Sequence, residues 1–134
     1  MMHWSARYVG LPFAAHGRSR DGLDCWGLVR LVYAEELAID LPSYADAYLS
    51  VSEVCELHAL LRGGIEAGDW RSTDEPRQFD VLLFRCGSYD SHVGLYISPG
   101  LMLHVTADDC VKVESYRTPV WHRRYMGAYR RGEV

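Results

Sequence analysis

The sequence predicts an α+β fold in which N-terminal helices pack on an antiparallel sheet of about five or six strands. Helical periodicity is confined to the first half of the 134-residue chain, and short β-type runs separated by turn residues fill the second half. Helices followed by strands at hairpin spacing favour an antiparallel sheet over alternating βαβ units. The length fits one domain, which we expect to span residues 1–134.

The helical part contains three predicted elements and one loop. A short helix over residues 3–9 is expected to end at Gly10, and residues 15–22 have the polar, glycine-rich composition of a surface loop. Asp24 is a suitable N-cap for a helix over residues 25–37, in which apolar side chains recur at helical spacing. Another helix is predicted over residues 51–62 and is closed by Gly63-Gly64.

The β part contains five runs with the composition of strands. They cover residues 79–84, 92–97, 102–105, 111–113 and 126–129. Turn residues separate them at Gly87-Ser88, Pro99-Gly100 and Asp108-Asp109. A short helical turn is expected around Trp121, before the last run.

Composition and charge exclude several classes of protein. The hydrophobic fraction is 49% and the net charge is −4, which argues against a nucleic-acid partner because such proteins carry a clustered basic face. Two arginine pairs, Arg123-Arg124 and Arg130-Arg131, are predicted to be solvated residues at the edge of the fold. No apolar stretch approaches the roughly 20 residues that span a bilayer. The N-terminal residues lack the apolar run of a signal peptide, so we expect synthesis and folding in the cytosol.

The cysteine spacing argues against a metal site and against a disulfide framework. The four cysteines are far apart and form no CxxC pair: Cys25, Cys55, Cys86 and Cys110. A chain of this size has a core large enough to fold without disulfides. We therefore expect free thiols in a reducing compartment, and neither a metal nor another cofactor.

Cys25 is the candidate nucleophile, because it opens the predicted helix over residues 25–37. The partial positive charge of a helix N-terminus lowers the pKa of a thiol, and the backbone N–H groups of the first turn are suitable donors to an oxyanion. Gly27 keeps side-chain bulk away from this helix start. The alternative interpretation is a buried helical cysteine that packs as a small hydrophobic residue.

Two histidines favour the catalytic interpretation. His92 begins an otherwise apolar strand, and His104 follows 12 residues later. A hairpin turning at Ser98-Pro99-Gly100 would place the two rings side by side, with His92 as general base and His104 as the group that fixes its tautomer. Each histidine taken alone has a structural alternative, as a residue at a strand end. None of the other cysteines has a histidine at a similarly suggestive spacing.

These residues resemble the sequence motifs of the NlpC/P60 cysteine peptidases, a papain-like family that cuts peptides of the bacterial cell wall. The nucleophile motif is similar to Gly22-Leu23-Asp24-Cys25-Trp26-Gly27, and the base motif to Ser91-His92-Val93-Gly94-Leu95-Tyr96. The strand of the third residue resembles Leu103-His104-Val105, and the N-terminal segment resembles Tyr8-Val9-Gly10-Leu11-Pro12-Phe13. The resemblance covers nearly the whole chain and is strongest to the branch found in phage tails, prophages and gene-transfer particles.

The resemblance implies a papain-like NlpC/P60 fold and cleavage of a peptidoglycan stem peptide, typically after γ-D-glutamate. Cys25 would attack the carbonyl, His92 would act as base and then as acid, and His104 would orient His92. Asp24 and Ser91 correspond to residues that help to bind substrate in the family. The implied partners are the peptide and other phage tail proteins, with the chain associated with a virion tail and acting at the wall.

Two positions depart from the family pattern. Many relatives carry a tyrosine near the oxyanion site where this chain has Phe13, and Tyr8 is a candidate to replace the missing hydroxyl. Trp26 occupies a position that is often small and polar, which predicts a reshaped substrate groove. Two alternatives therefore stay open. One is a tail-tip or assembly component with weak or no hydrolysis. The other is a cysteine amidase or acyltransferase that acts on another substrate.

Overall fold

The computed structural model describes residues 3–43, 63–64, 68–86, 89–107 and 109–132, and its main feature is a six-stranded antiparallel sheet. The strands lie in the order β3-β8-β4-β5-β6-β7. Their bounds are β3 Trp70–Thr73, β4 Val81–Cys86, β5 Tyr89–Ser98, β6 Leu101–His104, β7 Lys112–Ser115 and β8 Tyr125–Arg131. The predicted α+β class and antiparallel sheet are confirmed, and β5, β6 and β7 are consecutive neighbours joined by hairpins.

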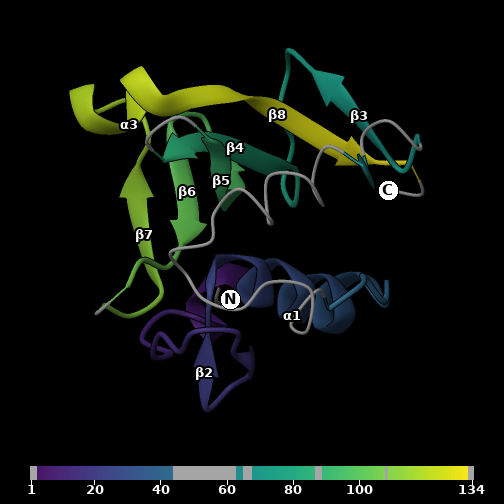
Figure 1. The fold of residues 1–134 in the computed structure, drawn as a ribbon, viewed down its shortest axis with the longest axis vertical. Coiled ribbons are helices and arrows are strands. Elements are labelled where there is room, and N and C mark those ends of the chain that lie inside the picture. Colours follow the sequence, from purple (N-terminus) through teal and green to yellow (C-terminus); the bar gives the residue numbers. More distant parts are fainter. Residues whose placement is uncertain (1–2, 44–62, 65–67, 87–88, 108, 133–134) are drawn as a thin grey trace.

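Helix α1 (Cys25–Leu37) lies against one face of this sheet and packs on β5. Figure 1 shows α1, the N-terminal segment and β2 together on one side of the sheet, with α3 at the start of β8. The remaining elements are short: the 3-10 helix η1 (Trp4–Arg7), the paired strands β1 (Arg18–Ser19) and β2 (Gly22–Leu23), and α3 (Pro119–Arg124). Among the described residues no helix has the length and apolar character needed to cross a bilayer.

The bounds of α1 are those that the sequence predicts, and both ends have a local cause. The Asp24 side chain accepts a hydrogen bond from the Gly27 N–H, which satisfies one of the unpaired donors of the first turn. At the other end Ala38 adopts a left-handed conformation with φ 57°, and its N–H bonds to the Tyr33 carbonyl. The buried side of the helix includes Leu28 and Val32, which are fully covered.

The sheet carries apolar side chains on both faces because successive residues of a strand point to opposite sides. In β4, Val81 and Leu83 belong to the main core under α1, whereas Leu82 and Phe84 face the other way. The second group forms what we term the far-face cluster, made of Leu82, Phe84, Tyr96, Met102, Trp121 and Ala128. Helix α3 supplies Trp121 to it, so the short helix predicted around this tryptophan is confirmed and covers the far face.

Several elements differ from the prediction. The segment 15–22 is not entirely loop, because β1 and β2 pair antiparallel there. Strand β3 had no predicted counterpart, and the helix predicted over residues 3–9 is a single 3-10 turn, with Gly10 at φ +94° beyond it. The helix predicted over residues 51–62 lies outside the described residues.

Arg130 is not the solvated edge residue that the sequence predicts. Its guanidinium donates two hydrogen bonds to the Asp80 carboxylate, at 3.1 and 2.8 Å, and both residues are buried. Alternation along β8 turns this side chain to the side that faces Asp80, which the run of basic residues does not reveal. The pair links β8 to the segment just before β4.

Candidate active site

Cys25 is the first residue of α1, as predicted. Cys25 is half-buried against the main core, and it is a thiol rather than half of a disulfide. The capping carboxylate of Asp24 also accepts a 2.7 Å hydrogen bond from Arg18, whose guanidinium in turn reaches Ser43. This arrangement fixes the direction of the first turn and therefore the position from which the thiol projects.

Gly27 has a specific reason to be glycine. A Cβ at this position would lie 2.0 Å from the carbonyl oxygen of Gly17, and real Cβ atoms do not approach backbone so closely. The 17–18 segment thus lies directly against the helix start. The prediction that Gly27 keeps bulk away from this helix start is confirmed.

The β5–β6 hairpin brings His92 and His104 together, as their spacing predicts. Nε2 of His92 lies 3.0 Å from Nδ1 of His104, within hydrogen-bond distance. Gly94 lies in β5 two residues after His92, and a Cβ there would meet the Met102 sulfur at 3.0 Å and the His104 Cβ at 3.4 Å. Both rings are almost completely removed from solvent. The contact uses Nε2 of His92, which leaves Nδ1 of His92 as the ring nitrogen that is available to a thiol.

Trp121 covers the two histidines. Its ring stacks on His92 with centroids 5.1 Å apart and planes inclined by 27°, and it meets His104 edge-on at 5.0 Å. The sequence predicts a helical turn around Trp121 but indicates no role for it in the site. The sequence around Trp121 does not indicate this contact, because α3 and the strands β5 and β6 come together only in the folded structure.

Glu114 is the second group that sequence reasoning missed. Its Oε1 lies 2.7 Å from Nε2 of His104, on the side of that ring away from His92. Strand β7 extends to Ser115, beyond the predicted run 111–113, and pairs with β6 so that Lys112 lies opposite His104. Alternation along β7 puts Glu114 on the same face as Lys112. A longer β7 in the prediction would have identified this glutamate.

Burial keeps the two histidines in their neutral forms. Loss of solvent lowers the pKa of His92 to about 3, and the neighbouring His104 and Arg124 add to this lowering. Burial also lowers the pKa of His104, although the hydrogen bond and the charge of Glu114 oppose the change. A neutral imidazole is the form that accepts a proton, so near pH 7 the pair has the protonation state of a base.

These pKa values predict a loss of stability in mild acid. The unfolded chain takes up a proton on His92 near pH 6.5, while the folded chain does so only near pH 3, so the contribution of His92 is complete above pH 6.5 and is lost as the pH falls toward 3. The lowered pKa of His104 acts in the same direction. We expect the free energy of unfolding to fall by up to about 1.4 kcal/mol per pH unit for each histidine. Urea titrations between pH 7 and 5 measure this slope.

The matched variants are His92→Gln and His122→Gln, since His122 is exposed on α3. The first should flatten the slope and the second should leave it unchanged. Equal slopes in the wild type and His92→Gln would contradict the assignment of the acid sensitivity to His92.

Asp24 and Trp26, which the resemblance predicts to bind substrate, both make structural contacts. The Asp24 carboxylate is buried between the Gly27 N–H and Arg18. Trp26 is 1% exposed, donates its indole N–H to the Pro42 carbonyl at 2.8 Å, and meets Trp70 edge-on. Trp26 is thus packed in the main core, and its predicted effect on the substrate groove stays a prediction.

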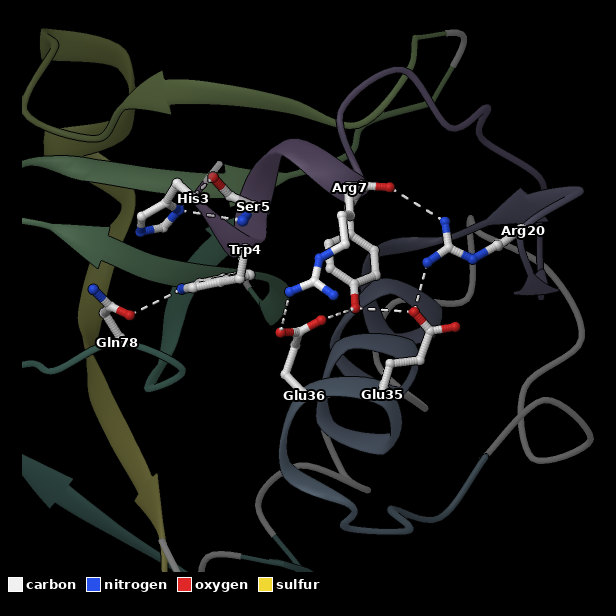
Figure 2. A network of polar contacts seen from close by, with 9 residues as sticks. His3, Trp4, Ser5, Arg7, Arg20, Glu35, Glu36 and Gln78 are labelled. Carbon is white, nitrogen blue, oxygen red and sulfur yellow. Dashed lines mark hydrogen bonds and ion pairs between the residues drawn. The ribbon is translucent and has the colours of Figure 1, made fainter. Parts of the chain in front are cut away.

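Tyr8 does not lie near Cys25. Its hydroxyl bonds the carboxylates of Glu35 and Glu36, near the C-terminal end of α1, in the network whose glutamates and arginines Figure 2 shows. Ten residues of helix correspond to about 15 Å, so this hydroxyl is far from an oxyanion at the helix start. The structure therefore does not bring Tyr8 into the place of the missing tyrosine hydroxyl.

Phe13 and Ser91 complete the predicted set. Phe13 pairs with Leu23 in an isolated parallel bridge and packs against the main core, which puts it next to the segment that leads into α1. Ser91 belongs to β5, immediately before His92, and its side chain lies outside the described part of the structure. Across the described ranges, no three His, Cys, Asp or Glu side chains gather in a way that would hold a metal ion.

The thiol and the two histidines belong to different packing groups. Cys25 contacts the main core, whereas His92 and His104 contact Trp121 of the far-face cluster. The elements that carry them are adjacent, because α1 packs on β5. The arrangement offers a helix-start thiol, a neutral base oriented by a second ring, and backbone donors at the first turn, which are the groups that acyl transfer requires.

Comparisons with known proteins identify the family of this chain. A model described as NlpC/P60 family matches residues 10–130. The chain is 29% identical over 131 residues to the "Murein DD-endopeptidase MepS/Murein LD-carboxypeptidase" of Escherichia coli strain K12, a match that covers 97% of this chain and 61% of that protein. It is 24% identical over 128 residues to the "Gamma-DL-glutamyl hydrolase" of Bacillus subtilis strain 168, covering 92% and 27%. The chain thus spans less than two thirds of either relative.

The fold is shared with solved structures. The crystal structure of an NlpC/P60 family protein from Bacillus cereus ATCC 10987 superimposes with a TM-score of 0.69, at 24% identity, covering 95% of this chain and 37% of that one. The expected fold, with helices packed on an antiparallel sheet, is therefore confirmed by both topology and superposition.

Proposed function

Because this chain belongs to the NlpC/P60 family, we propose that it is a cysteine peptidase that cleaves an amide bond in the stem peptides of bacterial peptidoglycan. The observation that carries the proposal is the buried, hydrogen-bonded pair of His92 and His104 on β5 and β6, since β5 packs on the helix that begins at Cys25. Together the three groups have the composition of a nucleophile, a base and an orienting residue.

In this mechanism the Cys25 sulfur attacks the peptide carbonyl while Nδ1 of His92 takes the thiol proton. The tetrahedral oxyanion is held by backbone N–H groups at the start of α1. The C–N bond then breaks, and His92 returns the proton to the leaving amine, which yields a thioester on Cys25. Water attacks the thioester with His92 again as base, which releases the acid and restores the thiol.

The substrate follows from the relatives rather than from a groove in this chain. The name of the E. coli relative specifies murein as its substrate, and that of the B. subtilis relative specifies a γ-glutamyl bond. We place the scissile bond after γ-D-glutamate, as the family resemblance implies. The DD-endopeptidase activity in the E. coli name is a different bond type, so the bond itself needs to be measured.

The experiment is cleavage of purified stem peptides, with products identified by mass spectrometry. One substrate is the tetrapeptide that contains γ-D-glutamyl-diaminopimelate, and the other is a DD-crosslinked dimer of it. The wild type and Cys110→Ala should cut the tetrapeptide after γ-D-glutamate, and Cys25→Ala should not. Cys110 is the matched control because, like Cys25, it is a partly buried thiol rather than half of a disulfide.

Each other result argues against a stated part of the proposal. Cleavage of the crosslinked dimer alone would replace the proposed bond by a DD bond. Absence of cleavage by the wild type would favour an assembly component that retains the fold. Undiminished cleavage by Cys25→Ala would refute the cysteine mechanism.

We further propose that the enzyme works in a phage or prophage tail and acts at the cell wall. The support is the resemblance of the nucleophile motif, with tryptophan at position 26, to the branch found in phage tails. Induction of a host that carries the gene, followed by purification of particles, tests this proposal. The chain should copurify with tails, and its presence only in the host cytosol would contradict the proposal.

A further inference from the structure

Glu114 is the last member of a line of hydrogen-bonded groups that starts at His92. Nε2 of His92 meets Nδ1 of His104 at 3.0 Å, and Nε2 of His104 meets Oε1 of Glu114 at 2.7 Å. Three consecutive strands carry these residues, one each from β5, β6 and β7. The two rings are buried, whereas the Glu114 side chain is 33% exposed at the surface end of the line.

The chemistry of a carboxylate determines where every proton in this line lies. An ionised carboxylate only accepts, so the His104 nitrogen that faces Glu114 must carry a hydrogen. Burial holds His104 neutral, so its other nitrogen, Nδ1, is an acceptor. The only hydrogen bond that Nδ1 can then make to His92 uses an N–H on Nε2 of His92. A neutral His92 with its hydrogen on Nε2 has its lone pair on Nδ1.

We propose that Glu114 is a positioning residue that sets the tautomers of both histidines, so that His92 presents an unprotonated Nδ1 to Cys25. The inference rests on the proposed cysteine-peptidase function for its catalytic meaning. His104 alone does not determine the direction of the line, because a neutral imidazole can donate from either nitrogen. The carboxylate removes this ambiguity.

Glu114 also stabilises the catalytic state in which His92 is protonated by the thiol. The cationic ring of His92 still donates from Nε2 to His104, and the negative charge of Glu114 lies one ring away. The other charges near the line are Lys112 and Asp109 beside His104, and Arg124 near His92. Lys112 lies 3.8 Å from the Glu114 carboxylate and forms a closer ion pair with Asp109.

Glu114→Gln is the decisive variant, because an amide can present either an oxygen or an N–H group to His104. When the amide donates into Nε2 of His104, that ring carries its hydrogen on Nδ1 and donates to Nε2 of His92. His92 then carries its own hydrogen on Nδ1, and the base is lost. Glu114→Ala removes the acceptor and leaves the direction of the line undetermined.

Nitrogen-15 NMR of the histidine side chains reads the tautomers directly in this 134-residue protein. In the wild type at pH 7 we expect both rings to carry hydrogen on Nε2. In Glu114→Gln the Nδ1–H form should become populated in both rings. The rate at which iodoacetamide alkylates Cys25, and kcat on the stem peptide, should fall together by about 10², since a wrong tautomer in a catalytic triad costs about 10⁴ and here acts through a second ring. KM should change little.

Asp40→Asn is the matched control for loss of a surface negative charge, because its carboxylate is 91% exposed beyond the far end of α1. This variant should keep the tautomers and the alkylation rate of the wild type. Unchanged tautomers in both Glu114 variants would overturn the proposal, as would shifted tautomers without loss of Cys25 alkylation. Neither readout needs a substrate, so failure of the wild type to cut stem peptides refutes the proposed function separately.

Discussion

Replacing His92 by glutamine is expected to lower the turnover of stem peptide by about 10⁴ or more, with little change in KM. The imidazole is proposed to take the Cys25 proton in the step that forms the thioester, and glutamine cannot accept it at neutral pH. Members of a catalytic triad act as a unit, so loss of the base costs nearly as much as loss of the nucleophile. Steady-state kinetics on the synthetic peptide measures the change.

Alkylation of Cys25 separates this effect from misfolding. In His92→Gln the rate of alkylation at pH 7 should fall while that of Cys110 stays the same, since Cys110 pairs with Pro12 in an isolated bridge and is not in the site. His122→Gln is the matched control and should retain the turnover of the wild type. Wild-type turnover in His92→Gln would show that another group is the base.

Replacing Asp80 by alanine is expected to lower the free energy of unfolding by about 3–5 kcal/mol. The substitution leaves Arg130 buried without its carboxylate, and the Arg77 N–H loses its 2.8 Å acceptor. Removing one member of a buried ion pair costs far more than the pair contributes, because the remaining charge stays desolvated. Urea denaturation followed by circular dichroism at pH 7 measures the change.

An exposed pair provides the comparison. Asp40 lies 3.5 Å from Arg30 and is almost fully solvated, so Asp40→Ala should cost less than about 1 kcal/mol. A similar small loss in Asp80→Ala would mean that water reaches Arg130 in the variant. A double replacement of Asp80 and Arg130 by apolar residues should recover much of the loss, since it removes the unpaired charge.

The parts of the fold that the sequence predicts well are those specified by neighbouring residues. The start of α1 follows from Asp24 as a cap, and the meeting of His92 with His104 follows from a tight turn at Pro99-Gly100. Each of these predictions needs only a short stretch of chain, and each is confirmed. Local rules such as capping and hairpin spacing are sufficient for them.

The parts that escaped prediction depend on contacts between distant segments. Trp121 reaches the histidines only because α3 folds over the far face, and Arg130 is buried only because Asp80 lies opposite it. The burial of Trp26 has the same origin, since Pro42 and Trp70 come from separate segments. Residue type and spacing do not show which partner a side chain meets across the sheet.

The site residues come from near and distant parts of the sequence, which has a consequence for folding. Residues 92, 104 and 114 lie on three strands joined by successive hairpins, so their contacts are local. Cys25 instead lies on α1, whose packing on β5 closes a much longer loop of chain. Local contacts form earlier than distant ones in small proteins. We therefore expect the contacts among residues 92, 104 and 114 to form before α1 docks on β5, so that in the proposed mechanism docking of α1 is the step that completes the site.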